Sequence, residues 1–321
     1  MSTFQLTRTL APDAAAADLR ADVLHGLTRS PKELPPKWFY DARGSELFDA
    51  ITRLPEYYPT RAEREILIAR APEIAAATGA RTLVELGSGS SEKTRFLIDA
   101  LLPGLAAYVP VDVSESALTG AAEALLADRP GLRVHALVAD FTRSVALPKT
   151  PGPRLVAFLG GTIGNLLPQE RRSFLSAVRG MTAAGDGFLL GTDLVKDEST
   201  LVAAYDDAAG VTAEFNKNVL AVIDRELGAD ADPDDFDHVA RWDREREWIE
   251  MRLRARHALT VKIRDLDLVV PFEAGEELRT EVSAKFRQEG VRAELAAAGF
   301  ELTRWWTDEE GRFALSLATA R

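Results

Sequence analysis

Thr82-Leu-Val-Glu-Leu-Gly-Ser-Gly-Ser-Ser-Glu-Lys-Thr-Arg-Phe-Leu, residues 82–97, is the stretch that decides the fold. It begins with an apolar run, 83–86, that predicts a buried strand, and it breaks at the glycine- and serine-rich segment 87–91. Apolar residues then return with helical spacing from Phe96 to Leu101. A strand, a glycine-rich turn and a helix start form a nucleotide-binding crevice at the carboxyl end of a parallel strand. Taken alone, the stretch is also compatible with a tight structural turn.

Two common phosphate-binding patterns are absent from this stretch. The dinucleotide fingerprint G-x-G-x-x-G needs a third glycine, and Glu92 stands at that position. The Walker pattern needs a lysine directly after its second glycine, a spacing that Lys93 does not meet. We therefore expect a nucleotide site that cradles no diphosphate.

Acidic residues close the next two predicted strands. The run 107–113 contains Asp112 where such folds place a carboxylate for the two ribose hydroxyls. The run 134–141 ends in Asp140 and Phe141, which suit the amino group and the flat face of an adenine. Either acid alone is readily explained as a surface residue at a strand end. Together, in order on successive strands, they predict an S-adenosylmethionine (SAM) site.

The rest of this region completes the predicted fold class. A fourth strand begins at Arg154 and ends in the glycine-rich segment 160–165, and a fifth spans 187–195. The alternation of strands and helices between about 60 and 195 is the doubly wound pattern. Residues 300–318 predict a closing antiparallel hairpin at the sheet edge, which favours a methyltransferase over a dehydrogenase. We therefore predict an α/β fold, a Rossmann-like class I SAM-dependent methyltransferase.

Residues 197–285 differ in character from this pattern. Two helices are predicted first, and 248–256 then alternates apolar and charged residues like a half-buried antiparallel strand, with 266–272 as its pairing candidate. We expect an inserted α+β domain on which the N-terminal segment packs. The predicted division is a SAM-binding domain, 60–196 and 286–321, and a substrate-binding domain, 1–59 and 197–285.

Composition excludes several classes of function. The chain has 321 residues and no cysteine, which excludes thiol catalysis, disulfides and cysteine-ligated metal. The four histidines lie far apart without metal-ligand spacing, so no metal site is expected. The net charge of −11 disfavours a nucleic-acid partner, and the stripe of Arg252, Arg254 and Arg256 is expected to be a solvated strand face.

Location and assembly are expected to be simple. No run approaches the roughly 20 apolar residues of a membrane span, so no membrane partner is expected. The first residues lack the apolar core of a signal peptide, which predicts a cytoplasmic protein. We expect a monomer.

Four longer motifs resemble the histidine-specific methyltransferase family. They are Lys37-Trp-Phe-Tyr-Asp-Ala-Arg-Gly-Ser-Glu-Leu-Phe-Asp, Thr52-Arg-Leu-Pro-Glu-Tyr-Tyr-Pro-Thr-Arg-Ala-Glu, Val84-Glu-Leu-Gly-Ser-Gly-Ser-Ser-Glu-Lys-Thr and Phe158-Leu-Gly-Gly-Thr-Ile-Gly-Asn-Leu. The resemblance covers nearly the whole chain. It implies three methyl transfers from SAM to the α-amine of free L-histidine. The product would be hercynine, the first intermediate of ergothioneine biosynthesis.

The resemblance also implies roles for individual residues. The cofactor residues that it implies are Gly87, Lys93, Asp112, Asp140 and Phe141. The substrate residues that it implies are Tyr57, Gly160, Asn165, Tyr205, Met251, Glu281, Val282 and Ser283, and the catalytic residues are Asn165 and Tyr40.

The chemistry of these implied residues matches that of histidine. Glu281 and Ser283 lie two apart, so an extended segment points both side chains the same way. A carboxylate that accepts one ring N–H, with a hydroxyl at the other nitrogen, would select an imidazole. Tyr205 and Tyr40 would hold the α-carboxylate, directly or through water, and Asn165 would orient the amine.

Three alternatives stay open at this point. The first is a SAM-dependent N-methyltransferase that acts on another amino acid, a small amine or a protein histidine. The second is a SAM-binding protein without catalysis, acting as a sensor or scaffold. The third, a nicotinamide dehydrogenase, is disfavoured by Glu92 in place of the third glycine.

Overall fold

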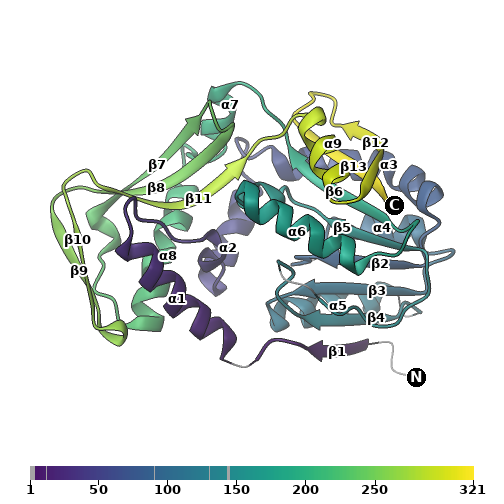
Figure 1. The fold of residues 1–321 in the computed structure, drawn as a ribbon, viewed down its shortest axis with the longest axis horizontal. Coiled ribbons are helices and arrows are strands. Elements are labelled where there is room, and N and C mark those ends of the chain that lie inside the picture. Colours follow the sequence, from purple (N-terminus) through teal and green to yellow (C-terminus); the bar gives the residue numbers. More distant parts are fainter. Residues whose placement is uncertain (1–3, 12, 90, 130, 143–144) are drawn as a thin grey trace. The chain divides into compact units, whose positions relative to one another are not determined.

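The computed structural model describes residues 4–11, 13–89, 91–129, 131–142 and 145–321, which form two compact units (Figure 1). Unit 1 consists of Met1–Ala11, Pro59–Val195 and Phe286–Arg321, and unit 2 of Pro12–Tyr58 and Lys196–Lys285.

Unit 1 is built on an eight-stranded sheet in the order β1-β4-β3-β2-β5-β6-β13-β12. The strands from β1 to β6 run parallel, whereas β13 pairs antiparallel with both β6 and β12. The predicted closing hairpin is therefore confirmed. The bounds are β1 Phe4–Arg8, β2 Thr82–Leu86, β3 Ala107–Asp112, β4 Val134–Val138, β5 Arg154–Phe158, β6 Gly187–Asp193, β12 Phe300–Thr307 and β13 Phe313–Ala320.

Helices cover both faces of this sheet because its parallel strands are apolar on both sides. Leu155 and Ala157 of β5 belong to the core that contains α3, α4 and α5. Phe158, the next residue, points to the other face and packs against Phe174 of α6, with ring centroids 4.6 Å apart. Figure 1 shows α6 lying across the front of the sheet. The bounds are α3 Pro59–Thr78, α4 Thr94–Leu101, α5 Glu115–Asp128, η2 Thr162–Asn165, α6 Pro168–Met181 and α9 Gln288–Ala297.

The strand order reverses between β2 and β5. From β2 the chain adds β3 and β4 on one side, and it then returns to add β5 and β6 on the other. In open α/β sheets, ligands bind outside the carboxyl ends of the strands at such a switch point. Gly87 follows β2 there and Gly160 lies just beyond β5, so both glycine-rich loops are at the expected place.

The first residues of the chain depart from the predicted division. Residues 1–59 were expected to lie together in the second domain, but β1 pairs in parallel with β4, Phe4 opposite Val134. The strand has five residues, of which Phe4 and Leu6 are partly buried and the other three are exposed. Such a short edge strand leaves little alternation in the sequence to predict it from.

Unit 2 combines helices with two small antiparallel sheets. The helices are α1 Ala14–Thr28, η1 Pro36–Phe39, α2 Ala42–Ile51, α7 Glu198–Ala203, α8 Val211–Leu227, η3 Pro233–Asp235 and η4 Arg264–Leu266. One sheet has the order β11-β8-β7, with bounds Glu277–Ala284, Trp248–Ala255 and Phe236–Asp243. The other is a hairpin of β9, Leu259–Ile263, and β10, Leu268–Phe272. Residues from α1, α2, α8 and both sheets share one apolar core.

One predicted pairing in this unit is wrong. Residues 266–272 were expected to pair with the strand at 248–256, but β10 pairs with β9 instead, and β8 lies between β7 and β11. Asp267, in the left-handed region with φ 48°, closes a tight local turn before β10. Local hairpin formation thus takes precedence over the longer-range pairing.

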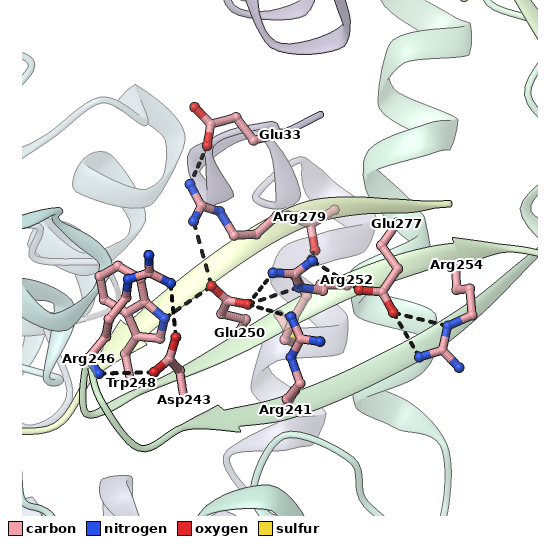
Figure 2. Close-up of polar contacts among 12 residues, drawn as sticks. Glu33, Arg241, Asp243, Arg246, Trp248, Glu250, Arg252, Arg254, Glu277 and Arg279 are labelled. Atoms are coloured by element: carbon pink, nitrogen blue, oxygen red, sulfur yellow. Dashed lines mark hydrogen bonds and ion pairs between the residues drawn. The ribbon is translucent and has the colours of Figure 1, made fainter. Parts of the chain in front are cut away.

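Charged side chains on one face of the β11-β8-β7 sheet bind one another, as Figure 2 shows. Glu250 is buried at the centre, where it accepts hydrogen bonds from Arg252 Nε at 2.9 Å and Trp248 Nε1 at 3.1 Å. Its carboxylate also faces Arg279 at 3.6 Å and Arg241 at 3.4 Å. Burial pushes the pKa of Glu250 upward, but the hydrogen bonds and positive charges outweigh it and hold the pKa below its usual value.

The predicted arginine stripe belongs to this paired network. Arg252 bonds to Glu277 at 2.9 Å, and Arg254 bonds to the same carboxylate at 2.7 Å. Arg256 bonds to Asp237 at 2.7 Å. Each of these three positive charges thus has an acidic partner within the sheet.

Candidate active site

The first glycine-rich loop and Asp112 are tied together in unit 1. Gly89 N donates to Asp112 Oδ2 at 3.0 Å, and Ser114 N donates to Oδ1 at 2.9 Å. Each oxygen keeps a lone pair beyond these bonds, so the carboxylate can still accept from two ribose hydroxyls. Gly87 and Gly89 have φ angles of 64° and 49°, which glycine adopts without strain.

An aromatic wall stands beside this loop. A Cβ on Gly87 would meet the Phe141 ring at 3.3 Å, so only a glycine leaves that space open. The Phe141 ring packs on Phe158, with centroids 5.5 Å apart, which fixes its orientation. Asp140 precedes the ring, and its Oδ1 accepts from Thr142 N at 2.9 Å. The loop, two carboxylates and a ring therefore lie together, as SAM recognition requires.

Lys93 is held by a residue that the sequence analysis missed. Glu63 of α3 is fully buried, and one of its oxygens binds Lys93 Nζ while the other accepts from Gly160 N at 2.7 Å. A Cβ on Gly191 would overlap the Glu63 carboxylate. Glu63 thus links both glycine-rich loops at the switch point. One feature of the sequence could have identified Glu63: it falls among the buried positions of α3. A buried carboxylate needs a partner, which indicates a contact with another segment.

A second buried acid lies beneath the first loop. Glu85 of β2 accepts hydrogen bonds from the hydroxyls of Thr94 and Tyr108, and Ser91 Oγ lies 2.8 Å from Tyr108 Oη. Burial raises the pKa of Glu85 to about 7, although both hydrogen bonds and the nearby Lys93 oppose that rise. Its charge state therefore changes near neutral pH.

The second loop presents Asn165. Gly160 and Gly161 have φ angles of 80° and 70°, and this left-handed pair turns the chain into η2, which ends at Asn165. Asn165 is partly buried. The N–H of Gly160 already donates to Glu63. The predicted contact of Gly160 with the substrate would therefore use its carbonyl oxygen or the space that its missing side chain leaves.

The predicted substrate residues in unit 2 begin with a line of aromatic rings. Tyr40 packs edge-on against Phe48 at 5.5 Å, Phe48 against Tyr57 at 6.1 Å, and Tyr57 against Tyr205 at 6.5 Å between centroids. Half of Tyr40 is exposed. Desolvation of its phenol, followed by the negative charge of Glu281 and by Tyr205, raises its pKa. The phenol therefore keeps its proton at neutral pH.

A β-bulge decides which side chains of β11 share a face. Arg279 pairs with Arg252 of β8, and Glu281 pairs with Met251, the neighbour of Arg252 in β8. Thr280, between Arg279 and Glu281, is therefore the extra residue of the bulge. Glu281 and Ser283 consequently lie on the same face as Met251 rather than with the charged network. Thr280 is anchored by its hydroxyl, which donates to Asn216 Oδ1 at 2.6 Å and to Met251 O at 3.0 Å. Three predicted substrate residues are thus brought together.

Val282 lies on the opposite face from these residues. It pairs with Glu250, so its side chain is directed away from Glu281 and Ser283. Any role of Val282 in substrate binding therefore falls to its backbone.

Lys285 is a further residue that the sequence analysis did not identify. It is buried, and its ammonium donates to Tyr205 Oη at 2.9 Å and to Ser283 Oγ at 2.8 Å. The two hydroxyl oxygens are 2.7 Å apart. The available signal was the i, i+2 continuation of Glu281 and Ser283 along one strand face.

Two features are absent from the part of the chain that the structure describes. Within those residues, no three histidine, aspartate or glutamate side chains gather in a way that could hold a metal ion. No helix among them is long and apolar enough to cross a bilayer.

Known proteins resemble this chain over most of its length. A model of the family "histidine-specific methyltransferase, SAM-dependent" matches residues 19–320. The histidine N-alpha-methyltransferase of Mycolicibacterium smegmatis is 58% identical over 98% of this chain and 99% of the relative. Ergothioneine biosynthesis protein 1 of Neurospora crassa is 29% identical over 86% of this chain and 32% of the relative. The 4-dimethylallyltryptophan N-methyltransferase of Epichloe festucae var. lolii is 28% identical over 89% of this chain and 90% of the relative.

These findings settle the class of enzyme. The predicted class I methyltransferase fold is confirmed, with its parallel sheet and closing hairpin. SAM is the methyl donor, as predicted, and the residues at the switch point fit it. The chain belongs to the family of histidine-specific, SAM-dependent methyltransferases.

Proposed function

We propose that this protein transfers three methyl groups from SAM to the α-amine of L-histidine, giving hercynine, the first step of ergothioneine biosynthesis. The observation that carries the proposal is the bulged strand β11. It sets a carboxylate, Glu281, and a hydroxyl, Ser283, on one face beside Met251. The names of the relatives from M. smegmatis and N. crassa support the substrate and the pathway.

Recognition of the imidazole is assigned to this strand face. Glu281 accepts the ring N–H, a hydroxyl of Ser283 or Tyr57 serves the other ring nitrogen, and Met251 covers the ring. Tyr205 and Tyr40 hold the α-carboxylate, directly or through water. A wrong amino acid leaves buried polar groups without partners, which can yield discrimination of about 10⁴. The 4-dimethylallyltryptophan relative indicates that the side chain accepted varies among similar enzymes. Another amino acid, a small amine or a protein histidine is therefore the second candidate substrate.

Catalysis is proposed to depend mainly on positioning. SAM supplies a methyl group on a sulfonium, and the accepting amine must be neutral and aligned. An α-amine with a pKa of about 8 is partly neutral at physiological pH, so a dedicated strong base is not required. We assign the orientation of the amine to Asn165. Tyr40, which keeps its proton, acts as a hydrogen-bond donor, and the rings of Tyr40 and Phe48 favour the growing cation.

Mass spectrometry of a reaction containing the enzyme, SAM and L-histidine tests the overall proposal. We expect mono-, di- and trimethylated histidine to appear, with the trimethylated form at the end of the reaction. A panel of free amino acids, small amines and histidine-containing peptides runs beside it. Preference for any of these over L-histidine, or a reaction that stops after one methyl group, contradicts the proposal.

Two variants test the residue assignments. Glu281→Ala is expected to weaken histidine binding in calorimetry more than SAM binding, with Glu273→Ala, an exposed acid of the same unit, as the control. Equal losses for both ligands contradict the assignment. Asn165→Ala is expected to lower kcat strongly, and unchanged histidine binding and turnover would remove it from the mechanism.

A further inference from the structure

A chain of hydrogen bonds in unit 2 joins the backbone at Tyr205 to the bulge of β11. His238 of β7 has its Nε2 2.8 Å from the carbonyl oxygen of Tyr205 and its Nδ1 2.8 Å from Asn216 Nδ2. Asn216 of α8 continues the chain, because its Oδ1 lies 2.6 Å from the hydroxyl oxygen of Thr280. Asn216 and Thr280 are fully buried, and the side chain of His238 is only 4% exposed. The chain therefore connects segments that are far apart in the sequence, largely out of contact with solvent.

The carbonyl oxygen of Arg252 fixes the direction of these hydrogen bonds. It lies 3.0 Å from one end of the Asn216 amide, and since a carbonyl only accepts, that end is the NH₂ group. The same NH₂ group faces His238 Nδ1, which must therefore accept and carries no proton. In the neutral ring Nε2 then carries the hydrogen and donates to the carbonyl of Tyr205. At the other end of the amide, Oδ1 accepts from the hydroxyl of Thr280.

The surroundings of His238 keep its imidazole neutral. Burial lowers its pKa below the usual value of 6.5. The Tyr205 carbonyl and the carboxylates of Asp206 and Asp207 oppose this fall in pKa, and the ammonium of Lys217 adds to it, but burial is the largest effect. Of the two carboxylates, that of Asp206 lies 3.9 Å from Nε2 and is half exposed. A neutral ring offers one donor and one acceptor, whereas an imidazolium has no acceptor for the neighbouring amide.

We propose that His238 is a positioning residue which, through Asn216, sets the separation between Tyr205 and the bulged segment of β11. The inference rests on the proposed function, in which Tyr205 holds the α-carboxylate of histidine while Glu281 and Ser283 bind its ring. The carboxylate and the ring of histidine are a fixed number of bonds apart, so both parts of the site must keep their spacing. His238 itself is assigned no contact with the substrate.

The bulge needs this anchor because Thr280 has no pairing partner in β8. Its hydroxyl bonds instead to Asn216 Oδ1 and lies 3.0 Å from the carbonyl oxygen of Met251. Breaking the chain leaves buried polar groups without partners, which is costly. The bulge then loses a contact that favours it over regular pairing. The orientation of the residues that follow, Glu281 and Ser283, is no longer fixed.

The tautomer of His238 can be measured in the wild-type protein without a ligand. Long-range ¹H–¹⁵N NMR of protein labelled with ¹⁵N-histidine distinguishes a ring nitrogen that carries a hydrogen from one that does not. Near neutral pH we expect a neutral ring with its hydrogen on Nε2. The spectrum of His238→Asn, in which these signals vanish, assigns them among the four histidines. A proton on Nδ1, alone or together with Nε2, overturns the inference.

Calorimetry then measures the Kd of L-histidine and of SAM for variants at both ends of the chain. His238→Leu removes both ring nitrogens, and Thr280→Val removes the hydroxyl but keeps the shape of the side chain. Each should raise the Kd of histidine about 10-fold, in line with the loss of a buried hydrogen bond, and change the Kd of SAM less than about 3-fold. Thr280→Ser keeps the hydroxyl and should stay within about 3-fold of wild type. His257→Leu, at a side chain that is 61% exposed, is the matched control.

Two further variants separate positioning from a general loss of stability. Ile263→Val trims the apolar core of the same unit without touching the chain, so it should lower the urea midpoint but change the Kd of histidine less than about 3-fold. His238→Leu combined with Thr280→Val should lose less than the product of the two single losses, because both break the same chain. If His238→Leu does not fold, His238→Asn replaces it, since its amide can accept from Asn216 but nothing donates to Tyr205.

Each outcome bears on one claim. The inference is overturned by unchanged histidine binding in His238→Leu or Thr280→Val, by equal losses for histidine and SAM, or by failure of Thr280→Ser to restore binding. It is also overturned by a comparable loss in Ile263→Val or by fully multiplicative losses in the double variant. A wild-type enzyme that neither binds nor methylates histidine overturns the proposed function instead. Normal wild-type turnover with unaffected variants overturns the inference alone.

Discussion

Glu85 makes the stability of the protein depend on pH in a way that can be measured. The residue is 4% exposed, and burial raises the pKa of its carboxyl from 4.5 to about 7. The folded state therefore holds this proton more tightly than the unfolded chain does. For a carboxyl whose pKa is raised on folding, the stabilisation is complete below pH 4.5 and is lost as the pH rises through about 7.

The size of the effect follows from this difference. About 2.5 pH units at 1.36 kcal/mol each correspond to about 3 kcal/mol in total. Of this, about 2 kcal/mol is lost between about pH 5.5 and pH 8.5. The glutamine of Glu85→Gln cannot titrate. The free energy of unfolding of this variant should therefore fall over that interval by about 2 kcal/mol less than that of the wild type.

Urea unfolding of both proteins at several pH values, without ligand, measures the difference. Glu85→Gln also leaves the hydroxyl of Thr94 or of Tyr108 without its acceptor, which costs about 1–3 kcal/mol at every pH. The pH dependence of the free energy of unfolding, rather than a constant difference between the two proteins, is therefore diagnostic. Glu123→Gln removes an exposed carboxylate as the control. Parallel curves for wild type and Glu85→Gln would refute the reasoning.

Three further substitutions test the switch point. Gly191→Ala places a methyl group on the Glu63 carboxylate, so denaturant unfolding should reveal a loss of about 2 kcal/mol, whereas Gly180→Ala, with open space around it, should lose nothing. Gly87→Ala combines a positive φ with a Cβ 3.3 Å from Phe141, and calorimetry should find SAM binding weakened about 10-fold; unchanged binding would contradict the cradle. Glu63→Gln keeps the side-chain volume but removes the negative charge beside Lys93. It should lower the free energy of unfolding by about 3 kcal/mol and weaken SAM binding. An unchanged free energy of unfolding together with unchanged SAM binding would show that the ion pair is dispensable.

The main sheet could be predicted from the sequence because its signals are local and mutually consistent. The apolar strand β2, the glycines after it and the acid that ends β3 each follow from residue type and spacing. The closing hairpin was equally visible in the segment 300–318. The edge strand β1 was missed, because five half-exposed residues carry too little periodicity. The partner of β10 was assigned wrongly, because periodicity identifies strands but not which strand each will join.

The candidate site was only partly accessible to the same reasoning. The resemblance supplied Glu281 and Ser283 as substrate residues, but the bulge that fixes their face has no signature around Thr280. Glu63 and Lys285 were missed because the groups that they contact lie on other segments of the chain. Their importance depends on contacts between segments far apart in the chain, such as Lys285 with Tyr205, which spacing along one element does not encode.

The extra residue in β11 has a consequence for how specificity could change. Since side chains alternate along a strand, one inserted residue shifts the phase of everything after it. If Thr280 entered the regular ladder instead of forming the bulge, Glu281 would pair with Glu250, and the strand would turn Glu281 towards the arginines and Val282 away from them. A change that flattens the bulge would therefore exchange a polar surface for a more apolar one at unchanged chain length. Substrate range in such a scaffold is open to revision by register as well as by substitution.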